Sequence, residues 1–171
     1  MKKPTGLRLR PIHAADCQAI PYAFSQQGWK KTQGLYESYL RDQEDGTRDV
    51  IIAQVDSEFA GYLTINWQAN YQPFRERQIP EIVDFNVLKK YQRRGIGTAL
   101  MDEAERRIKR VSSVAGIGVG VYKDYGPAQI LYFHRGYQPD GNGLTLDSQP
   151  VLYGAEITVD DALVLALTKE L

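Results

Sequence analysis

Hydrophobic and polar side chains are arranged along this chain with the periods of strands and helices. Short apolar runs over residues 7–12, 49–55, 59–67 and 82–88 predict four strands, the middle two joined as a hairpin. Residues 94–111 instead repeat apolar side chains every three or four positions, which predicts a long helix with one packed face. That face consists of Ile96, Leu100, Ala104, Ile108 and Val111.

Three further helices are expected from cap and turn signals. The first begins at Asp16, whose side chain is suited to cap it, and runs through Phe24. The second spans residues 32–41, where apolar and aromatic side chains recur on one face. The third opens at Gly126, which a proline follows in the favoured first turn, and Gly136 closes it.

The remaining segments are strands, turns and one irregular stretch. Strands are expected over residues 115–121 and 162–168. The dipeptides Asp140-Gly141 and Asn142-Gly143 carry turn signals. Residues 69–80 are polar and aromatic without a regular period, so they are expected to be irregular.

The order of these elements predicts the fold class. Antiparallel hairpins come first and a strand–helix–strand crossover comes later, which is typical of a mixed α/β (α+β) sheet with helices on its faces. No repeat and no linker-like tract divides the sequence. We therefore expect a single domain over residues 1–171.

Composition excludes several classes of partner. The 21 basic and 21 acidic residues give a formal net charge of zero, so no whole-molecule field favours nucleic acid or anionic membrane. One cysteine forms no internal disulfide, and with two histidines it makes no metal-ligand pattern, so no metal is expected. No apolar run approaches the roughly 20 residues that span a bilayer, and no secretory signal is present. We expect a soluble cytoplasmic protein.

One segment combines features of an anion-binding site. Residues 87–99 have the pattern of a strand end, a basic turn with two glycines and the start of a helix. The first amides of a helix lack internal partners and lie at its positive end, and glycines let a phosphate approach them. Leu100 stands where a dinucleotide fingerprint needs its third glycine, and the lysine and hydroxyl pair of a P-loop is absent.

The hexapeptide Gln92-Arg93-Arg94-Gly95-Ile96-Gly97 resembles the acyl-coenzyme A pyrophosphate motif of the GNAT superfamily of N-acetyltransferases. The family's downstream pattern is matched by Ala128, Leu131, Tyr132 and Gly136-Tyr137. The resemblance implies a central, twisted, mostly antiparallel mixed sheet flanked by helices. It also implies transfer of an acetyl group from acetyl-CoA, as co-substrate, to a small-molecule or peptide amine.

The resemblance also implies roles for individual residues. It places the pantetheine arm along the backbone of Asn86 and Val87, and it gives Tyr132 the role of general acid toward the leaving thiolate. The base that deprotonates the amine is assigned to Glu81, with Asp84 or water left open. The remaining cofactor-binding assignments are Gln92, Arg93, Arg94, Gly95, Ile96, Gly97 and Thr98 around the pyrophosphate, and Tyr125 in the place of the family's asparagine.

Other interpretations of the same residues stay open at this point. Tyr132 is also compatible with a core aromatic, and Glu81 with a solvated strand end. The alternating Gly116, Gly118 and Gly120 favour close backbone approach over a cofactor loop. For the whole chain, the alternatives are an acyl-CoA-binding sensor without catalysis and a modifier that binds RNA through its basic turn. A monomer and a homodimer are both compatible with the sequence.

Overall fold

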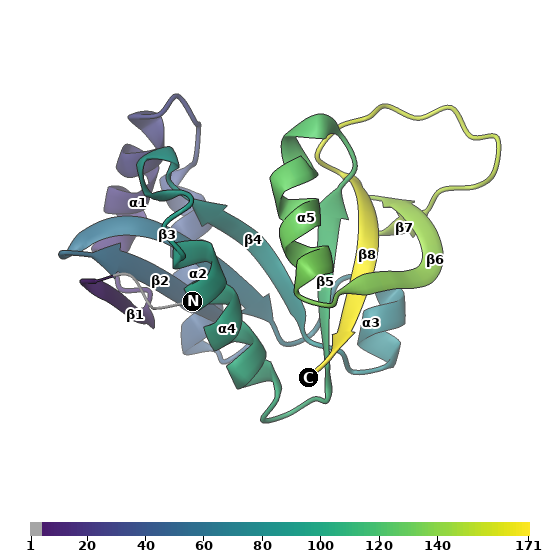
Figure 1. Ribbon diagram of the computed structural model, residues 1–171, viewed down its shortest axis with the longest axis horizontal. Coiled ribbons are helices and arrows are strands. Elements are labelled where there is room, and N and C mark those ends of the chain that lie inside the picture. Colours follow the sequence, from purple (N-terminus) through teal and green to yellow (C-terminus); the bar gives the residue numbers. More distant parts are fainter. Residues whose placement is uncertain (1–4) are drawn as a thin grey trace. The chain divides into compact units, whose positions relative to one another are not determined.

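A computed structural model of the protein describes residues 5–171, and Figure 1 traces its elements in chain order. The chain forms two compact units, each built from two separate stretches of sequence. Unit 1 comprises the described residues up to Trp67 together with Val83–Arg107, and unit 2 comprises Gln68–Ile82 and Ile108–Leu171.

Unit 1 contains the predicted hairpin. Its strands are β1 (Leu7–Pro11), β2 (Arg48–Val55) and β3 (Glu58–Asn66), which pair antiparallel in the order β1-β2-β3, and β4 (Glu81–Val87) follows β3. The two residues between β2 and β3 have φ angles of 51° and 71°. A two-residue turn with both φ angles positive matches the twist of the flanking strands, so the hairpin prediction is confirmed.

Three helices belong to unit 1: α1 (Asp16–Ser25), α2 (Gln33–Glu44) and all but the last residue of α4 (Ile96–Ile108). In the first of them, Phe24 is fully buried and its ring meets those of Phe59 and Tyr62 edge-on at 5.8 and 6.1 Å between centroids. Aromatic side chains from a helix and a strand therefore form part of the core of this unit, together with buried aliphatic side chains.

Two details of the predicted helices were wrong. Asp16 is not the cap of α1; its carboxylate accepts the His13 amide at 2.8 Å and pairs with the Arg10 guanidinium at 2.6 Å. Asp16 is the first residue inside the helix, Ala15 stands at the cap position, and both carboxylate oxygens of Asp16 are bonded to Arg10 of β1. Val111 is 69% exposed, because α4 ends at Ile108 before the fifth apolar position can join the packed face.

Unit 2 contains the other strands. The first residues of β4 run parallel to β5 (Val114–Gly120), which pairs antiparallel with β8 (Leu163–Glu170). Strand β8 pairs antiparallel with β6 (Gln138–Leu146), and β7 (Gln149–Pro150) adds a short antiparallel edge. Antiparallel pairs outnumber the one parallel pair in the part of the chain that is described, so the mixed, mostly antiparallel fold is confirmed.

The expected turns at residues 140–143 were wrong. These residues lie inside β6, where the register against β8 shifts between Pro139 and Leu144. The carboxylate of Asp140 accepts the Tyr71 hydroxyl at 2.8 Å and the Asn142 amide at 2.9 Å. Side-chain hydrogen bonding therefore holds the glycine-rich segment as a bulge instead of a reversal.

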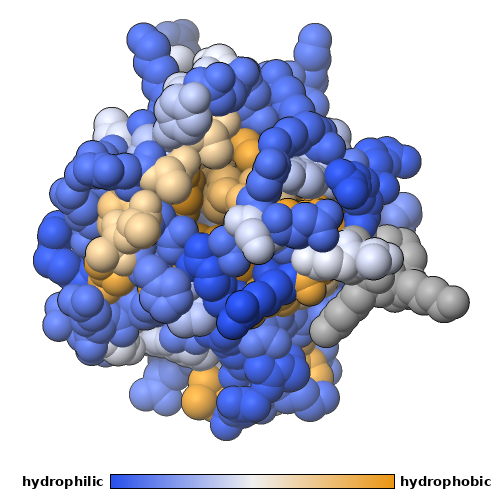
Figure 2. Space-filling view, turned by 90° about the vertical axis from the view of Figure 1, so that its left-hand side faces the viewer, coloured by the Kyte–Doolittle hydropathy of each residue, from blue (hydrophilic) through white to orange (hydrophobic). Residues whose placement is uncertain are grey.

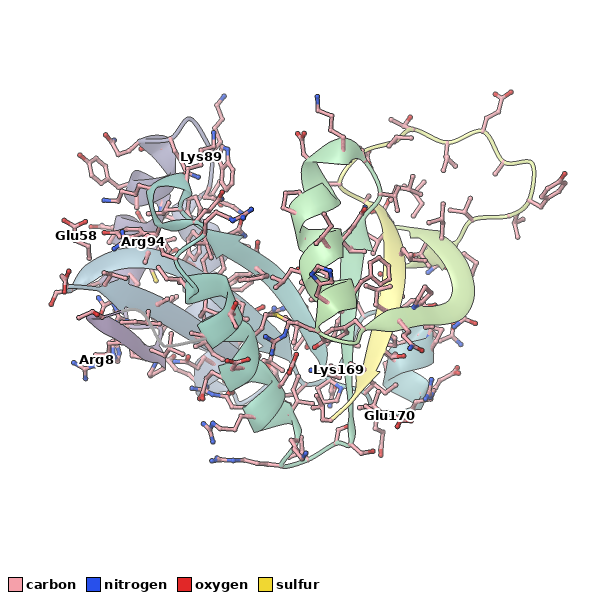
Figure 3. The ribbon with its side chains drawn as sticks, in the orientation of Figure 1. Arg8, Glu58, Lys89, Arg94, Lys169 and Glu170 are labelled. Atoms are coloured by element: carbon pink, nitrogen blue, oxygen red, sulfur yellow. The ribbon has the colours of Figure 1, made fainter. Side chains whose placement is uncertain are left out.

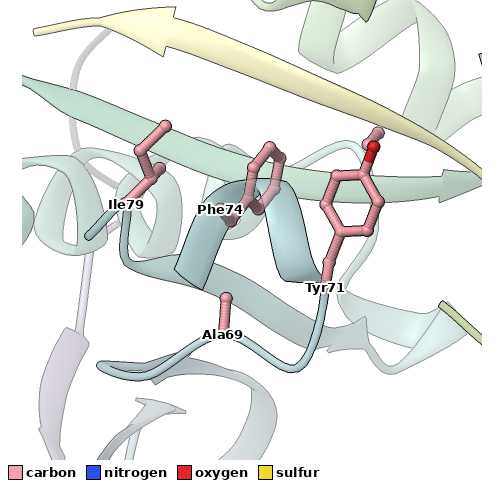
Figure 4. Close-up of a cluster of buried hydrophobic side chains, with 5 residues drawn as sticks. Ala69, Tyr71, Phe74 and Ile79 are labelled. Atoms are coloured by element: carbon pink, nitrogen blue, oxygen red, sulfur yellow. The ribbon is translucent and has the colours of Figure 1, made fainter. Parts of the chain in front are cut away.

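The segment at 69–80, expected to be irregular, contains a short helix and part of the core of unit 2. Helix α3 (Gln72–Glu76) places Phe74 beside Tyr71, Ala69 and Ile79, and all four side chains are buried (Figure 4). A Cβ added at Gly116 would stand 2.4 Å from the Phe74 ring. The prediction that this glycine permits close approach is confirmed.

The other predicted helix of unit 2 is α5 (Gly126–His134), which has its proline in the first turn. Gly136 follows it with a φ of 90°, as a helix-closing glycine requires.

Figure 2 shows one face of the molecule, where hydrophilic residues predominate around a smaller apolar area. In residues 5–171, every helix falls short of the length or apolar character that a bilayer span needs.

Candidate functional site

The segment after β4, which we call the anion loop (residues 88–98), is hydrogen-bonded to neighbouring residues of unit 1. The Leu88 amide donates to the Ala60 carbonyl of β3 at 2.9 Å. Residues 89–91 form a single 3-10 turn, and the buried Tyr91 donates its hydroxyl to Glu58 at 2.7 Å. The β2–β3 hairpin and the anion loop are thus held together at both ends of this turn.

Left-handed backbone at two positions reverses the chain before the helix. Arg93 has a φ of 60° and Gly95 a φ of 78°. Only glycine adopts such a conformation without cost, so the first glycine of the motif is explained by backbone geometry. The side chain of Gln92 donates to the Val87 carbonyl at 3.0 Å, which fixes the loop against the end of β4.

The first amides of helix α4 precede its backbone hydrogen-bond ladder. Its first hydrogen bond runs from the Ala99 amide to the Gly95 carbonyl at 3.0 Å, so the amides of Ile96, Gly97 and Thr98 precede the helical ladder. The helix dipole is positive at this end. The loop therefore has the donor arrangement predicted for a pyrophosphate site.

Cationic side chains belong to the turn that precedes these amides. Arg93 and Arg94 are exposed, and the Arg94 guanidinium lies over the Tyr91 ring at 5.3 Å. The Lys89 ammonium lies 5.6 Å from the centroid of the Trp29 ring, and Figure 3 shows Lys89 and Arg94 on the turn that precedes α4. Stacking on aromatic rings orders these long side chains without neutralising their charge.

Two glycines give the backbone room at this place. A Cβ at Gly61 in β3 would stand 2.6 Å from the carbonyl oxygen of Asn86, and one at Gly97 would stand 3.0 Å from the Phe85 ring. Gly61 belongs to no motif, and its one signal in the sequence is that a glycine inside a strand pattern indicates close backbone approach. Gly61 thus sets the position of the strand end to which the pantetheine arm was assigned.

We expect Gly61→Ala to lower the free energy of unfolding by about 1–3 kcal/mol, because a backbone carbonyl cannot turn aside as a side chain can. We also expect weaker acetyl-CoA binding, since the Asn86 carbonyl would be displaced. Chemical denaturation and calorimetry measure the two effects. Gly34→Ala in α2 is the matched control: nothing lies within 4 Å of its added Cβ, so stability should stay or rise by up to about 1 kcal/mol. Equal behaviour of the two variants would contradict this account.

Tyr132 belongs to α5 in unit 2 and is 5% exposed. Its ring lies 6.1 Å from that of Tyr137. Burial, and to a smaller extent the charge of Tyr125, raises the pKa of Tyr132 above the ordinary value for a phenol. At neutral pH its hydroxyl is therefore a proton donor, as the predicted role requires.

Glu81 also belongs to unit 2, at the start of β4. Its carboxylate oxygen Oε1 lies 3.9 Å from the point where a Cβ on Gly118 would stand, so the glycine leaves room beside it. Burial, Asp140 and then Glu81 itself raise the pKa of Tyr71 to about 12. The carboxylate thus lies near a buried aromatic cluster and not at a fully solvated strand end.

Tyr125 is held within unit 2 as well. Its hydroxyl donates to Asp161 at 3.0 Å, and its ring is 5.1 Å from that of Tyr122. A Cβ at Gly120 would stand 2.4 Å from the Tyr125 ring. Close packing on β5 is therefore the structural role of this ring, and its assignment to cofactor binding stays a prediction.

Asp84 lies in unit 1 and has a φ of 50°, which interrupts the alternation of side chains along β4. In the sequence, Asp84 stands out only as an alternative base, because the tyrosines that surround it are distant along the chain and form no motif with it. In residues 5–171, no three His, Cys, Asp or Glu side chains are placed to share a metal ion.

The sequence is similar to a known protein family and to a curated relative. The sequence profile of the acetyltransferase (GNAT) family matches residues 14–137. A curated N-alpha-acetyltransferase of Sulfurisphaera tokodaii is 29% identical over 93 residues, which are 51% of this chain and 54% of the relative. The matched region thus spans about half the length of that relative.

Solved structures match over nearly the whole chain. A GNAT-family protein from Desulfovibrio desulfuricans has a TM-score of 0.71 at 14% identity, covering 96% of this chain and 98% of its own. A Salmonella typhimurium protein with its cofactor acetyl-CoA has a TM-score of 0.66 at 16% identity, covering 97% and 94%. At such identities the likeness establishes the fold.

Proposed function

Because this chain belongs to the acetyltransferase (GNAT) family, we propose that it transfers an acetyl group from acetyl-CoA directly to a primary amine. The observation that carries the proposal is the anion loop, where a left-handed turn at Gly95 leads into the first amides of a helix, ahead of its hydrogen-bond ladder. Such a start binds phosphate through its amides and dipole.

The residues of unit 1 fit the co-substrate. The amides of Ile96, Gly97 and Thr98 would bind the pyrophosphate, and Arg93 and Arg94 would add charge-assisted bonds. The amide of Gln92 is engaged with a backbone carbonyl, so its part is to position the loop. Acetyl-CoA supplies the thioester that the amine attacks.

The acceptor needs a base. An alkylammonium has a pKa of about 10.4 and is almost wholly protonated at neutral pH, and only the neutral amine is a nucleophile. Glu81 would take this proton, directly or through a water molecule. The partial burial of Glu81 and the room that Gly118 leaves beside its carboxylate support this role.

Tyr132 would donate its proton toward the departing sulfur. The raised pKa keeps the phenol protonated until negative charge develops on sulfur, and the same apolar surroundings would raise the basicity of that thiolate. The amine and the thioester are joined directly, so no covalent enzyme species is needed and proximity lowers the barrier.

The proposal is tested by incubating the protein with acetyl-CoA and a panel of primary amines while free thiol is followed. Thiol release that depends on an amine supports the proposal. Micromolar acetyl-CoA binding without thiol release from any amine, small molecule or peptide, would favour a binding module. Absence of calorimetric acetyl-CoA binding would overturn both. The name of the curated relative makes an amino-terminal peptide amine a necessary member of the panel.

We expect Glu81→Gln to lower kcat about 100-fold at neutral pH, because the amine then loses its base. The rate of the variant should rise with pH toward the amine pKa of about 10.4, where free amine no longer needs a base. Initial rates of thiol release between neutral and alkaline pH measure this profile. Glu76→Gln in α3 removes an exposed carboxylate of the same unit and should retain the profile of the unchanged protein. Parallel profiles for both variants would remove Glu81 from the mechanism.

A further inference from the structure

The carboxylate of Asp84 is surrounded by hydrogen-bond donors in unit 1. Its Oδ1 accepts the Lys31 ammonium at 3.2 Å and the Asn86 side-chain amide at 2.7 Å. Its Oδ2 accepts the Tyr39 hydroxyl at 3.0 Å and the Tyr62 hydroxyl. The site thus holds one negative charge, one neutral amide, two phenols and one alkylammonium.

Aromatic rings make up the wall of this site. The Lys31 ammonium lies 5.8 Å from the centroid of the Phe24 ring, and the Tyr36 hydroxyl donates to that of Tyr62 at 3.2 Å. Burial and then the Asp84 charge raise the pKa of Tyr62 and of Tyr39, so both phenols stay protonated donors. A carboxylate behind aromatic faces is the chemistry that recognises an alkylammonium group.

The ammonium that now occupies this place can be exchanged. The side chains of Lys31 and Asp84 are 23% and 18% exposed, whereas Phe24, Tyr36 and Tyr62 are fully buried. Lys31 lies in the connection between α1 and α2, outside any helix or strand. A partly exposed pair with a single 3.2 Å contact is weakly held, so another ammonium in solution competes with it.

We propose that Asp84 and the rings around it bind an alkylammonium group of the acceptor, and that Lys31 occupies this site in the acceptor-free protein. The inference rests on the proposed acetyl transfer and specifies its substrate class. A carboxylate favours the charged form of an amine, whereas the attacking nitrogen must be neutral. The group bound at Asp84 is therefore a second ammonium, and the acceptor is a diamine.

The experiment compares α,ω-diamines of three to eight carbons with butylamine, in the unchanged protein and in three variants. Asp84→Asn removes the charge but keeps the shape of the side chain and the tolerance for a positive φ. This variant should raise the KM for 1,4-diaminobutane at least tenfold and leave the KM for butylamine unchanged. Lys31→Ala empties the site and should lower the diamine KM several-fold. Lys30→Ala, an exposed neighbouring lysine, should change neither.

The diamine KM is expected to fall in Lys31→Ala and to rise in Asp84→Asn. If the two residues had only a structural role, both substitutions would impair the protein, so the opposite changes in KM identify a binding role. Equal KM values for diamines and butylamine in every variant, with thiol release intact, would overturn the inference and leave the proposed function standing. Calorimetry measures the Kd for 1,4-diaminobutane directly, so this test does not depend on acetyl transfer. Diamine binding that depends on Asp84, without thiol release, would support the ammonium site and overturn the proposed function instead.

Discussion

Tyr132→Phe is expected to lower kcat about 100-fold, within the range for loss of a general acid, while the acetyl-CoA Kd stays within a factor of about two. The hydroxyl is buried and protonated, so its loss removes a donor to the leaving sulfur without altering the ring that packs near Tyr137. Steady-state thiol release gives kcat, and calorimetry gives Kd.

Tyr71→Phe is the matched control for this result. It also removes a single hydroxyl from a buried tyrosine of unit 2, which now donates to Asp140 at 2.8 Å. It should lower the free energy of unfolding by about 1 kcal/mol and leave kcat unchanged. If Tyr132→Phe retains full kcat, the residue is a core aromatic, as the alternative interpretation of the sequence holds.

The double charge reversal Arg93→Glu with Arg94→Glu is expected to raise the acetyl-CoA Kd about 100-fold or more. Each arginine can make a charge-assisted bond worth about 1.5–3 kcal/mol, and the introduced carboxylates repel the pyrophosphate. Both side chains are exposed, so the free energy of unfolding should change by no more than about 0.5 kcal/mol each. Calorimetric titration with acetyl-CoA measures the change in Kd.

A control with the same change in net charge separates the loop from the overall field of the protein. Lys109→Glu with Arg110→Glu reverses two exposed cations just after α4 and should alter the Kd by less than about threefold at physiological salt, where the Debye length is about 8 Å. Equal weakening by the two double variants would show that general electrostatic attraction, not the anion loop, binds the pyrophosphate.

The elements that the sequence predicted well are those with strong local signals. The β2–β3 hairpin follows from two apolar runs around a short polar turn, and α4 from a regular apolar repeat. The segment at 69–80 carries no such repeat, because its buried side chains, Phe74 among them, are selected by contact with β5. Periodicity reports local geometry and cannot report a partner that is distant in sequence.

The candidate site also contains one part that a local motif predicts and one part that only the fold brings together. Glycines, arginines and a helix start within residues 92–98 are contiguous, so the anion loop was visible as a motif. Asp84 and Tyr62 come from β4 and β3, Lys31 comes from the connection between α1 and α2, and no sequence spacing joins the three residues. The positive φ of Asp84 is likewise a property of the folded strand that one sequence does not display.

By itself, the sequence determined most of the order of elements, the family resemblance and the place of the anion loop, because each depends on neighbouring residues and their intrinsic conformations. The tertiary structure alone decided that Gly61 admits the Asn86 carbonyl and that Asp84 is enclosed by tyrosines and an ammonium. Those contacts depend on which strands and helices pack together, and packing joins residues without regard to their distance along the chain.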